Sequence, residues 1–194
     1  MHAVERVGIF GGTFDPVHVG HLVAALYAHE QLVLDRTLLV IAGEPWQKEG
    51  TVIAPAAARL EMVQAAVDGI TGLEVSSIEI DRGGPTYTMD TVEAMASPAR
   101  ELFLVVGADV AARIDTWHRA DELRAAVALA VVTRGDDDQP PPCEGWRCVP
   151  VVMPRIDISS TALRERVARG APIDFLVPPG AIRVIRERRL YTPA

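Results

Sequence analysis

The clearest indication of the fold is the sequence Gly8-Ile9-Phe10-Gly11-Gly12-Thr13-Phe14-Asp15-Pro16-Val17-His18-Val19-Gly20-His21. An apolar run ends in a glycine pair, as expected where a strand turns close to a ligand. Two histidines three positions apart then open an amphipathic helix, so both lie on one face of its first turn. A helix N-terminus offers unpaired N–H groups to a phosphate. The stretch therefore predicts a site that binds and rearranges a phosphate chain.

Each half of this stretch has a simpler interpretation when taken alone. Paired glycines after a strand often form only a tight turn, and a histidine at the start of a helix is often a solvated cap. Taken together, in the order Gly-Gly-Thr-Phe-Asp-Pro-x-His-x-Gly-His, they form a long and specific string. This string resembles the signature of the nucleotidyltransferase superfamily that carries a His-x-Gly-His motif.

Length and composition indicate one globular domain over residues 1–194, with 49% hydrophobic and 23% charged residues. The net charge of −7 disfavours a nucleic-acid partner without a local basic patch. A basic cluster does occur, but we interpret it as the solvated face of a terminal helix: Arg183, Arg186, Arg188 and Arg189. No apolar run has the length of a membrane span, so we expect a cytoplasmic protein without a membrane partner. The oligomeric state is left open, a homo-oligomer included.

Two cysteines, Cys143 and Cys148, lack the second pair of a zinc site. A structural disulfide needs an oxidising compartment. We expect both cysteines to be incidental.

Strand-like and helix-like segments alternate along the chain. Several of the strands are apolar on both faces, which is typical of a parallel sheet covered by helices on each side. The expected strands are Arg6–Phe10, Thr37–Ala42, Glu74–Ile80, Leu102–Gly107, Val127–Thr133 and Cys148–Val152. The predicted fold class is a doubly wound α/β domain with a mostly parallel sheet and its ligand at the carboxyl ends of the strands. A helical C-terminal segment, Ile158 to Leu190, completes it.

A second string, Ile158-Ser159-Ser160-Thr161-Ala162-Leu163-Arg164, starts that segment. Serine and threonine are ordinary helix N-caps. A cap needs only one hydroxyl, whereas an anion site favours several donors and a fork-shaped cation. We therefore predict phosphate binding here. The string resembles the Ile-Ser-Ser-Thr-x-x-Arg element of the nicotinate-nucleotide adenylyltransferase family.

Further stretches agree with that family over nearly the whole chain. Residues 82–91, Arg-Gly-Gly-Pro-Thr-Tyr-Thr-Met-Asp-Thr, resemble its loop that holds the nicotinate moiety. Gly107-Ala108-Asp109 resembles its nucleotide-binding turn, and Trp117 matches its aromatic position that stacks on the pyridine ring. One loop, Pro45-Trp46-Gln47-Lys48, departs from the commoner Pro-Pro-His-Lys but retains the lysine.

The resemblance implies a Rossmann-like nucleotidyltransferase that transfers AMP from ATP to nicotinate mononucleotide, giving nicotinate adenine dinucleotide and pyrophosphate in NAD biosynthesis. His18 and His21 would be the catalytic residues. The implied ATP and phosphate ligands are Gly11, Gly12, Thr13, Phe14, Gly20, Lys48, Gly107, Asp109, Ser159, Ser160, Thr161 and Arg164. The implied mononucleotide ligands are Thr86, Tyr87, Trp117 and Trp46. Mg²⁺ would be held mainly by the phosphates, with no metal site on the protein.

Alternative functions remain at this point. Nicotinamide mononucleotide or phosphopantetheine are other acceptors for an adenylyltransferase, and a silent module would bind ATP without turnover. The second string and the Gly-Pro-Thr-Tyr-Thr segment argue against phosphopantetheine, and the His18–His21 pair argues against a silent module. An NAD-dependent dehydrogenase is disfavoured because the Gly-x-Gly-x-x-Gly loop is absent.

Overall fold

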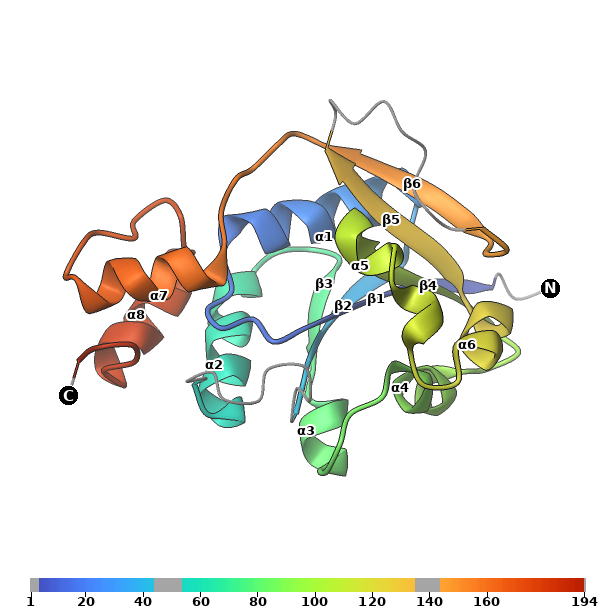
Figure 1. Ribbon diagram of the computed structural model, residues 1–194, viewed down its shortest axis with the longest axis horizontal. Coiled ribbons are helices and arrows are strands. Elements are labelled where there is room, and N and C mark those ends of the chain that lie inside the picture. Colours follow the sequence, from blue (N-terminus) through green and yellow to red (C-terminus); the bar gives the residue numbers. More distant parts are fainter. Residues whose placement is uncertain (1–3, 44–53, 135–143, 194) are drawn as a thin grey trace.

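Six parallel strands form one sheet in the computed structural model, which describes residues 4–43, 54–134 and 144–193 (Figure 1). The strand order is β3-β2-β1-β4-β5-β6, and every neighbouring pair is parallel. The strands are β1 (Glu5–Gly12), β2 (Arg36–Ile41), β3 (Leu73–Ser76), β4 (Arg100–Gly107), β5 (Ala128–Arg134) and β6 (Cys148–Met153). This order confirms the predicted doubly wound fold and places its switch point between β1 and β4.

Helices cover both faces of the sheet, which explains the uninterrupted apolar strands. In β2, Leu39 and Ile41 pack into a cluster with α1, α2 and α8, while Leu38 and Val40 pack into a cluster with α4, α5 and α6. The helices are α1 (Val19–Gln31), α2 (Ala56–Val67), α3 (Ile78–Arg82), α4 (Thr88–Met95), α5 (Ala108–Ala111), α6 (Ala120–Ala126), α7 (Ser160–Ala168) and α8 (Pro179–Glu187). A short 3₁₀ helix, η2 (Ile114–Thr116), precedes α6.

The third predicted strand is wrong in its second half. Strand β3 ends at Ser76, and α3 takes the place of the expected extension to Ile80. Two hydroxyls favour this turn: the Ile78 N–H donates to Ser76 Oγ at 3.4 Å, and Ser77 Oγ–H donates to Asp81 Oδ2 at 2.7 Å. Such local side-chain bonds compete with a strand ladder. The other five predicted strands are confirmed to within two residues at each end.

The predicted helical C-terminal segment is confirmed and consists of two helices. Gly170, with a φ of 69°, follows α7, and Pro178 precedes α8. Helix α8 packs on α2, and Figure 1 shows α7 and α8 at the end of the molecule away from the N-terminus.

The expectation that the cysteines are incidental is wrong for Cys148, which is disulfide-bonded.

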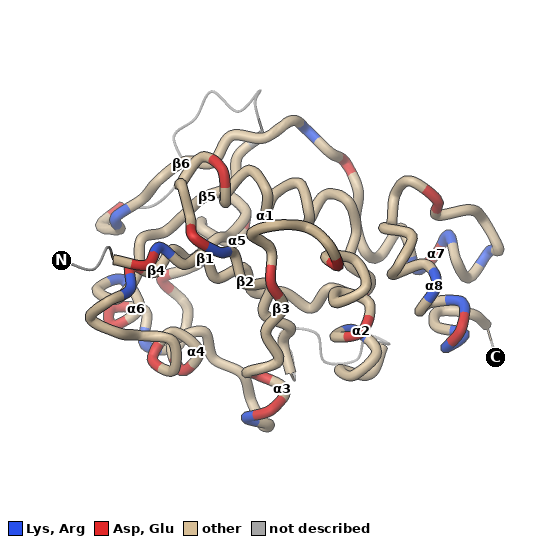
Figure 2. Tube along the Cα trace, turned by 180° about the vertical axis from the view of Figure 1, so that it is seen from behind, with Lys and Arg blue, Asp and Glu red and all other residues tan. Residues whose placement is uncertain are grey.

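The basic cluster on the terminal helix is exposed, as predicted. Arg188 Nε lies 2.5 Å from Glu61 Oε2, and Arg186 Nη2 lies 3.9 Å from Asp174 Oδ1. Figure 2 shows blue and red residues close together at this end of the molecule. Two of its four arginines are thus paired with carboxylates on the surface.

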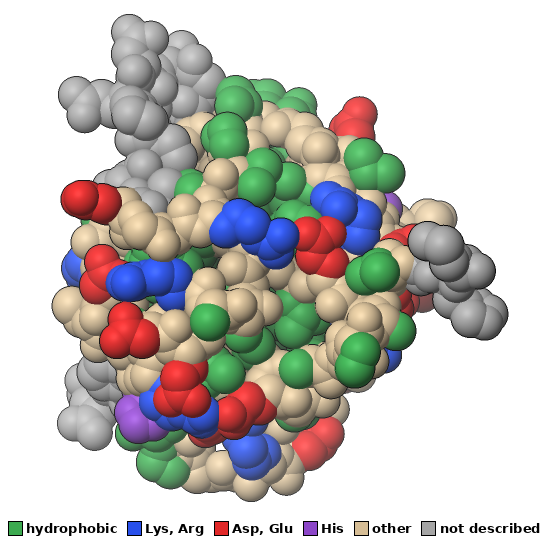
Figure 3. Space-filling model, turned by 90° about the vertical axis from the view of Figure 1, so that its right-hand side faces the viewer, with side chains coloured by type: hydrophobic (Ala, Val, Ile, Leu, Met, Phe, Trp, Pro, Cys, Tyr) green, Lys and Arg blue, Asp and Glu red, His purple; other side chains and the backbone are tan. Residues whose placement is uncertain are grey.

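The amino ends of the strands carry alternating charges. Glu5 pairs with Arg36 and Arg100, and Glu101 pairs with Arg6 and Arg147. Figure 3 views the molecule from the side on which the N-terminus lies, where blue and red side chains lie next to one another. The candidate site described below lies at the opposite, carboxyl edge of the sheet.

Candidate active site

The last two residues of β1 are glycines with different surroundings: Gly12 is needed for packing, and Gly11 borders open space. A Cβ on Gly12 would lie 2.8 Å from the Phe14 ring, so only glycine fits there without displacing the ring. Phe14 itself has a φ of 49°, and its side chain is buried. A Cβ on Gly11 would meet nothing within 4 Å. The space next to Gly11 is therefore open, and a ligand could approach the backbone closely there.

His18 and His21 form a stacked pair at the start of α1. Their ring centroids lie 3.6 Å apart with 22° between the planes. The His18 backbone N–H donates to His21 Nδ1 at 3.2 Å. Because Nδ1 of His21 is the acceptor, the ring hydrogen of the neutral form lies on Nε2. The two rings lie together, but the prediction that both histidines lie on the first helical turn is wrong for His18, which is the N-cap of α1 with extended backbone; only His21 lies on that turn.

His18 is the buried member of the pair, with 7% of its surface exposed. Burial lowers its pKa to about 4, so the ring is neutral at pH 7. Its Nδ1 is buried without a hydrogen-bond partner within the described chain. A bound anion would favour the protonated ring, since a nearby opposite charge stabilises the charged form.

Gly20 leaves room for the His18 ring, because it has no side chain. A Cβ at position 20 would lie 3.1 Å from His18 Nδ1, closer than ordinary van der Waals contact. The glycine between the two histidines therefore has a steric cause: a larger residue would press on the buried ring.

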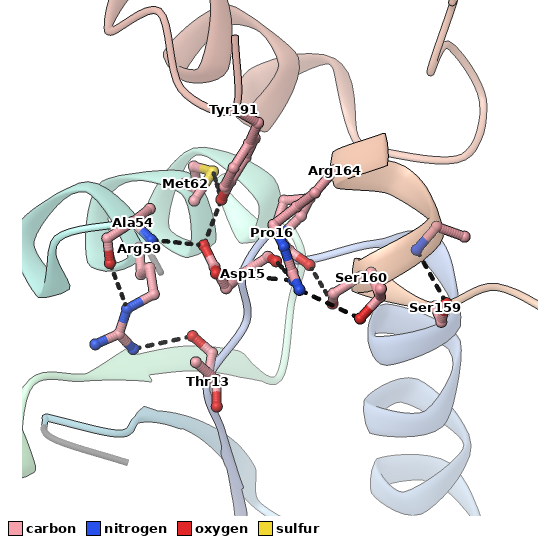
Figure 4. Close-up of polar contacts among 12 residues, drawn as sticks. Thr13, Asp15, Pro16, Ala54, Arg59, Met62, Ser159, Ser160, Arg164 and Tyr191 are labelled. Atoms are coloured by element: carbon pink, nitrogen blue, oxygen red, sulfur yellow. Dashed lines mark hydrogen bonds and ion pairs between the residues drawn. The ribbon is translucent and has the colours of Figure 1, made fainter. Parts of the chain in front are cut away.

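Helix α7 meets the same turn from the far end of the chain. Ser159 is its N-cap and accepts a hydrogen bond from the Ala162 N–H at 3.2 Å. Ser160 Oγ–H donates to the Pro16 carbonyl at 3.0 Å (Figure 4). The ordinary capping role of Ser159 is thus present, and Ser160 joins α7 to the residues just before His18.

Arg164 also faces this turn and is largely buried. Its Nη1–H donates to the Asp15 carbonyl at 2.7 Å, and its Nη2–H donates to Thr161 Oγ1 at 3.2 Å. The side chain keeps 18% of its surface exposed. The fold therefore brings together the two sequence segments predicted to bind phosphate. One hydrogen bond of Arg164 is already made to the turn that precedes His18.

A cavity of about 330 Å³ opens at the carboxyl ends of β1, β2 and β4. Its walls come from the turn after β1, from the start of α4 and from the segment after η2. The predicted site residues among its lining are Gly11, Gly12, Thr13, Thr86, Tyr87, Gly107 and Trp117. This is the crevice in which doubly wound sheets bind their ligands.

Aromatic rings form one side of the cavity. Trp117 is half-buried and packs against the core, and the rings of Tyr87 and His118 lie 4.4 Å apart. His118, which had no predicted role, also lines the cavity. Asp109 is exposed and is not among the lining residues. Lys48 and Trp46 lie outside the described residues.

Comparisons with known proteins agree with this geometry. Residues 9–166 match the cytidylyltransferase-like family. A protein named "Probable nicotinate-nucleotide adenylyltransferase" from Corynebacterium kroppenstedtii is 40% identical over 97% of this chain and 92% of its own length. The protein of the same name from Saccharopolyspora erythraea is 41% identical over 98% of this chain and 92% of its own length. The chain belongs to the nicotinate-nucleotide adenylyltransferase family.

Solved structures show the same fold. The Plasmodium falciparum nicotinic acid mononucleotide adenylyltransferase complexed with NaAD superposes with a TM-score of 0.79, at 18% identity, over 96% of this chain and 97% of the other. The same Plasmodium enzyme complexed with APC gives a TM-score of 0.76 over 96% of this chain and 97% of the other, at 17% identity. At such identities the likeness concerns the fold alone.

In this member of the adenylyltransferase family, Arg59 is a site residue that sequence reasoning missed. It is 2% exposed and donates to four carbonyls: Ala54 (3.0 Å), Thr13 (3.0 Å), Ala42 (2.7 Å) and Gly43 (2.9 Å). It thereby joins the loops that follow β1 and β2. The signal was in the sequence, because an arginine stands on the apolar stripe of α2, three and four positions before Met62 and Val63.

Glu79 is a cavity residue that sequence reasoning also did not predict. It is 8% exposed, accepts a hydrogen bond from Thr91 Oγ–H at 2.8 Å, and lines the cavity. Burial raises the pKa of its carboxyl. Thr91 in turn accepts from Arg82 Nη2 at 3.3 Å, so α3 and α4 are joined beneath the site.

Arg119 fixes the aromatic wall to α4. Its guanidinium donates to Glu93 and to Glu122, and it directly follows Trp117 and His118.

Two features are absent from the part of the chain that the structure describes. Within the described ranges no three His, Cys, Asp or Glu side chains lie together as a possible metal site. In the same ranges no helix is both long and apolar enough to span a bilayer.

Proposed function

We propose that this chain transfers AMP from ATP to nicotinate mononucleotide, forming nicotinate adenine dinucleotide and pyrophosphate. The observation that carries the proposal is that the His18–His21 pair lies next to an aromatic-walled cavity at the β1–β4 switch point. Neither histidine is a lining residue, but the His21 ring centroid lies 6.3 Å from that of Phe10, which lines the cavity. The histidine pair suits a phosphate chain and the cavity suits a pyridine ring. Relatives named for this reaction, at about 40% identity over almost the whole chain, support it.

The reaction needs charge stabilisation rather than a strong base, because the attacking group is already a phosphate anion. The enzyme must hold two polyanions in line and stabilise the α-phosphate and the leaving pyrophosphate. The N–H groups of Gly11, Gly12 and Thr13 and the rings of His18 and His21 would contact the triphosphate. Phe14 and Gly20 would act by shaping this turn, since each packs against a neighbouring group of it.

Helix α7 would hold the β- and γ-phosphates from the opposite side. Ser159, Ser160, Thr161 and Arg164 lie at its first turns, where backbone N–H groups and the helix dipole favour anions. Ser160 Oγ–H and Arg164 Nη1–H are bonded to the turn before His18, so these residues would place the helix start as well as contact phosphate. Asp109 and Gly107 would contact the adenosine from the end of β4.

The mononucleotide would bind in the aromatic part of the cavity. Trp117 offers a ring face for stacking, and the N–H groups near Thr86 and Tyr87, at the start of α4, would meet the nicotinate carboxylate. From the segment between β2 and α2, Trp46 is proposed for the mononucleotide and Lys48 for the phosphates of ATP. Mg²⁺ would enter with ATP as part of the substrate, coordinated by phosphate oxygens and water.

The test compares three acceptors under one set of conditions. We expect pyrophosphate release from ATP and Mg²⁺ to be fastest with nicotinate mononucleotide, slower with nicotinamide mononucleotide, and at background with phosphopantetheine. A reaction without acceptor is the control for ATP hydrolysis. Release with phosphopantetheine alone, or no acceptor-dependent release at all, would contradict the proposed function.

A further inference from the structure

The buried carboxylate of Asp15 joins the C-terminus of the chain to the turn that carries His18. Asp15 is 2% exposed, and its Oδ1 accepts from the Ala54 N–H at 3.1 Å and from the Tyr191 hydroxyl at 2.5 Å (Figure 4). Its Oδ2 lies 3.8 Å from Arg164 Nη1. A buried carboxylate is costly unless it is hydrogen-bonded. The position of Asp15, three residues before His18, therefore depends on these partners.

Tyr191 is held in place as a donor to this carboxylate. Burial and the bond to Asp15 raise the pKa of its hydroxyl above the ordinary value, so the group keeps its proton. Its backbone has a φ of 63°, a left-handed conformation that persists where surrounding contacts fix it. Tyr191, which follows α8, is thus fixed against the site.

Two further bonds connect the C-terminal part of the chain to the same turn. The Val19 N–H, at the first residue of α1, donates to the Leu176 carbonyl at 3.0 Å, and Ser160 bonds the Pro16 carbonyl. Together with the Tyr191 bond, they hold residues on both sides of His18: Asp15 and Pro16 before it and Val19 after it. We call Ser160, Leu176 and Tyr191 the C-terminal strap.

We propose that Tyr191 is a positioning residue for adenylyl transfer: through Asp15 it sets the place of the turn that carries His18 and His21. The inference rests on the proposed function, since it takes the histidine pair as the phosphate ligands. Loss of the hydroxyl leaves Asp15 with the Ala54 N–H and the nearby guanidinium of Arg164. The carboxylate then moves toward Arg164, and the turn moves with it.

The test is Tyr191→Phe, which removes one oxygen, with Tyr27→Phe as the matched control. Tyr27 lies on α1, half-buried against the core, away from the turn. We expect Tyr191→Phe to lower kcat about tenfold, because small misplacement of reacting groups is costly, while the KM for nicotinate mononucleotide stays unchanged. Tyr27→Phe should keep the wild-type kcat. Both are measured well below the unfolding temperature of each variant.

A second readout does not depend on turnover. In NMR spectra, the imidazole C–H signals of His18 and His21 should shift in Tyr191→Phe and stay in place in Tyr27→Phe. If the wild-type protein fails to make the dinucleotide, the proposed function fails, and these signals alone decide whether the strap positions the turn. A lower unfolding temperature with unchanged kcat and unchanged histidine signals would overturn the inference and leave Tyr191 a merely stabilising residue.

Discussion

We expect His21→Ala to lower kcat by about a hundredfold or more, as for loss of a strong electrostatic donor to a developing charge. The hydrogen bond from the His18 backbone to His21 Nδ1 leaves the ring hydrogen on Nε2. The Nε2–H group of His21 therefore takes no part in the cap bond and is the group that would donate to the developing charge. The expected loss is in kcat, with a smaller change in the KM for ATP, because the donor acts mainly in the transition state.

His21→Asn is the matched control for the capping role of the same side chain. The asparagine oxygen occupies about the place of Nδ1, so it can still accept from the His18 N–H, but it has no counterpart of Nε2. We expect His21→Asn to unfold at the wild-type temperature and to lose kcat as His21→Ala does. A variant with wild-type kcat would mean that His21 only caps α1 and would remove it from the chemistry.

The second large effect is on stability. Arg59→Met should lower the free energy of unfolding by about 3–5 kcal/mol, because it leaves several buried carbonyls without a donor and removes the positive charge near the buried Asp15. Arg59 bonds four carbonyls. Its pKa is lowered by burial, and the charge of Asp15 opposes that effect. Urea denaturation followed by circular dichroism measures the change.

Arg188→Met is the control for this experiment. Arg188 is exposed on the C-terminal side of α8 and pairs with Glu61 on the surface, so its loss should cost about 1 kcal/mol or less. If Arg59→Met were no more destabilising than Arg188→Met, the loops after β1 and β2 would not depend on the buried guanidinium.

Local patterns predicted much of this molecule. Apolar runs such as Leu38–Ile41 gave the strands because a residue buried on either face of a covered sheet must be apolar. The three-residue spacing at a helix start indicated that the two histidines lie together, although His18 is the N-cap of α1 and not a helical residue. At Ser159 the ordinary capping role of serine, which the phosphate interpretation had set aside, is present in the structure.

The parts that sequence reasoning missed depend on partners far away in the chain. Asp15 is fixed by Tyr191, 176 positions later, and by Ala54. Arg59 is buried only because four loop carbonyls converge on it. The end of β3 at Ser76 was set by hydroxyl bonds that compete with an otherwise apolar alternation. Propensity and periodicity carry no record of such tertiary partners.

A crystal structure of this protein with nicotinate adenine dinucleotide would show directly whether the histidine pair and the cavity form one active site. We expect the pyrophosphate within about 3 Å of His21 Nε2, a hydrogen-bond distance, and beside the N–H groups of Gly11 and Gly12. The pyridine ring should lie against Trp117 and Tyr87. A dinucleotide bound with its pyrophosphate away from the histidine pair, or with its pyridine ring outside the cavity, would show that this is not the active site.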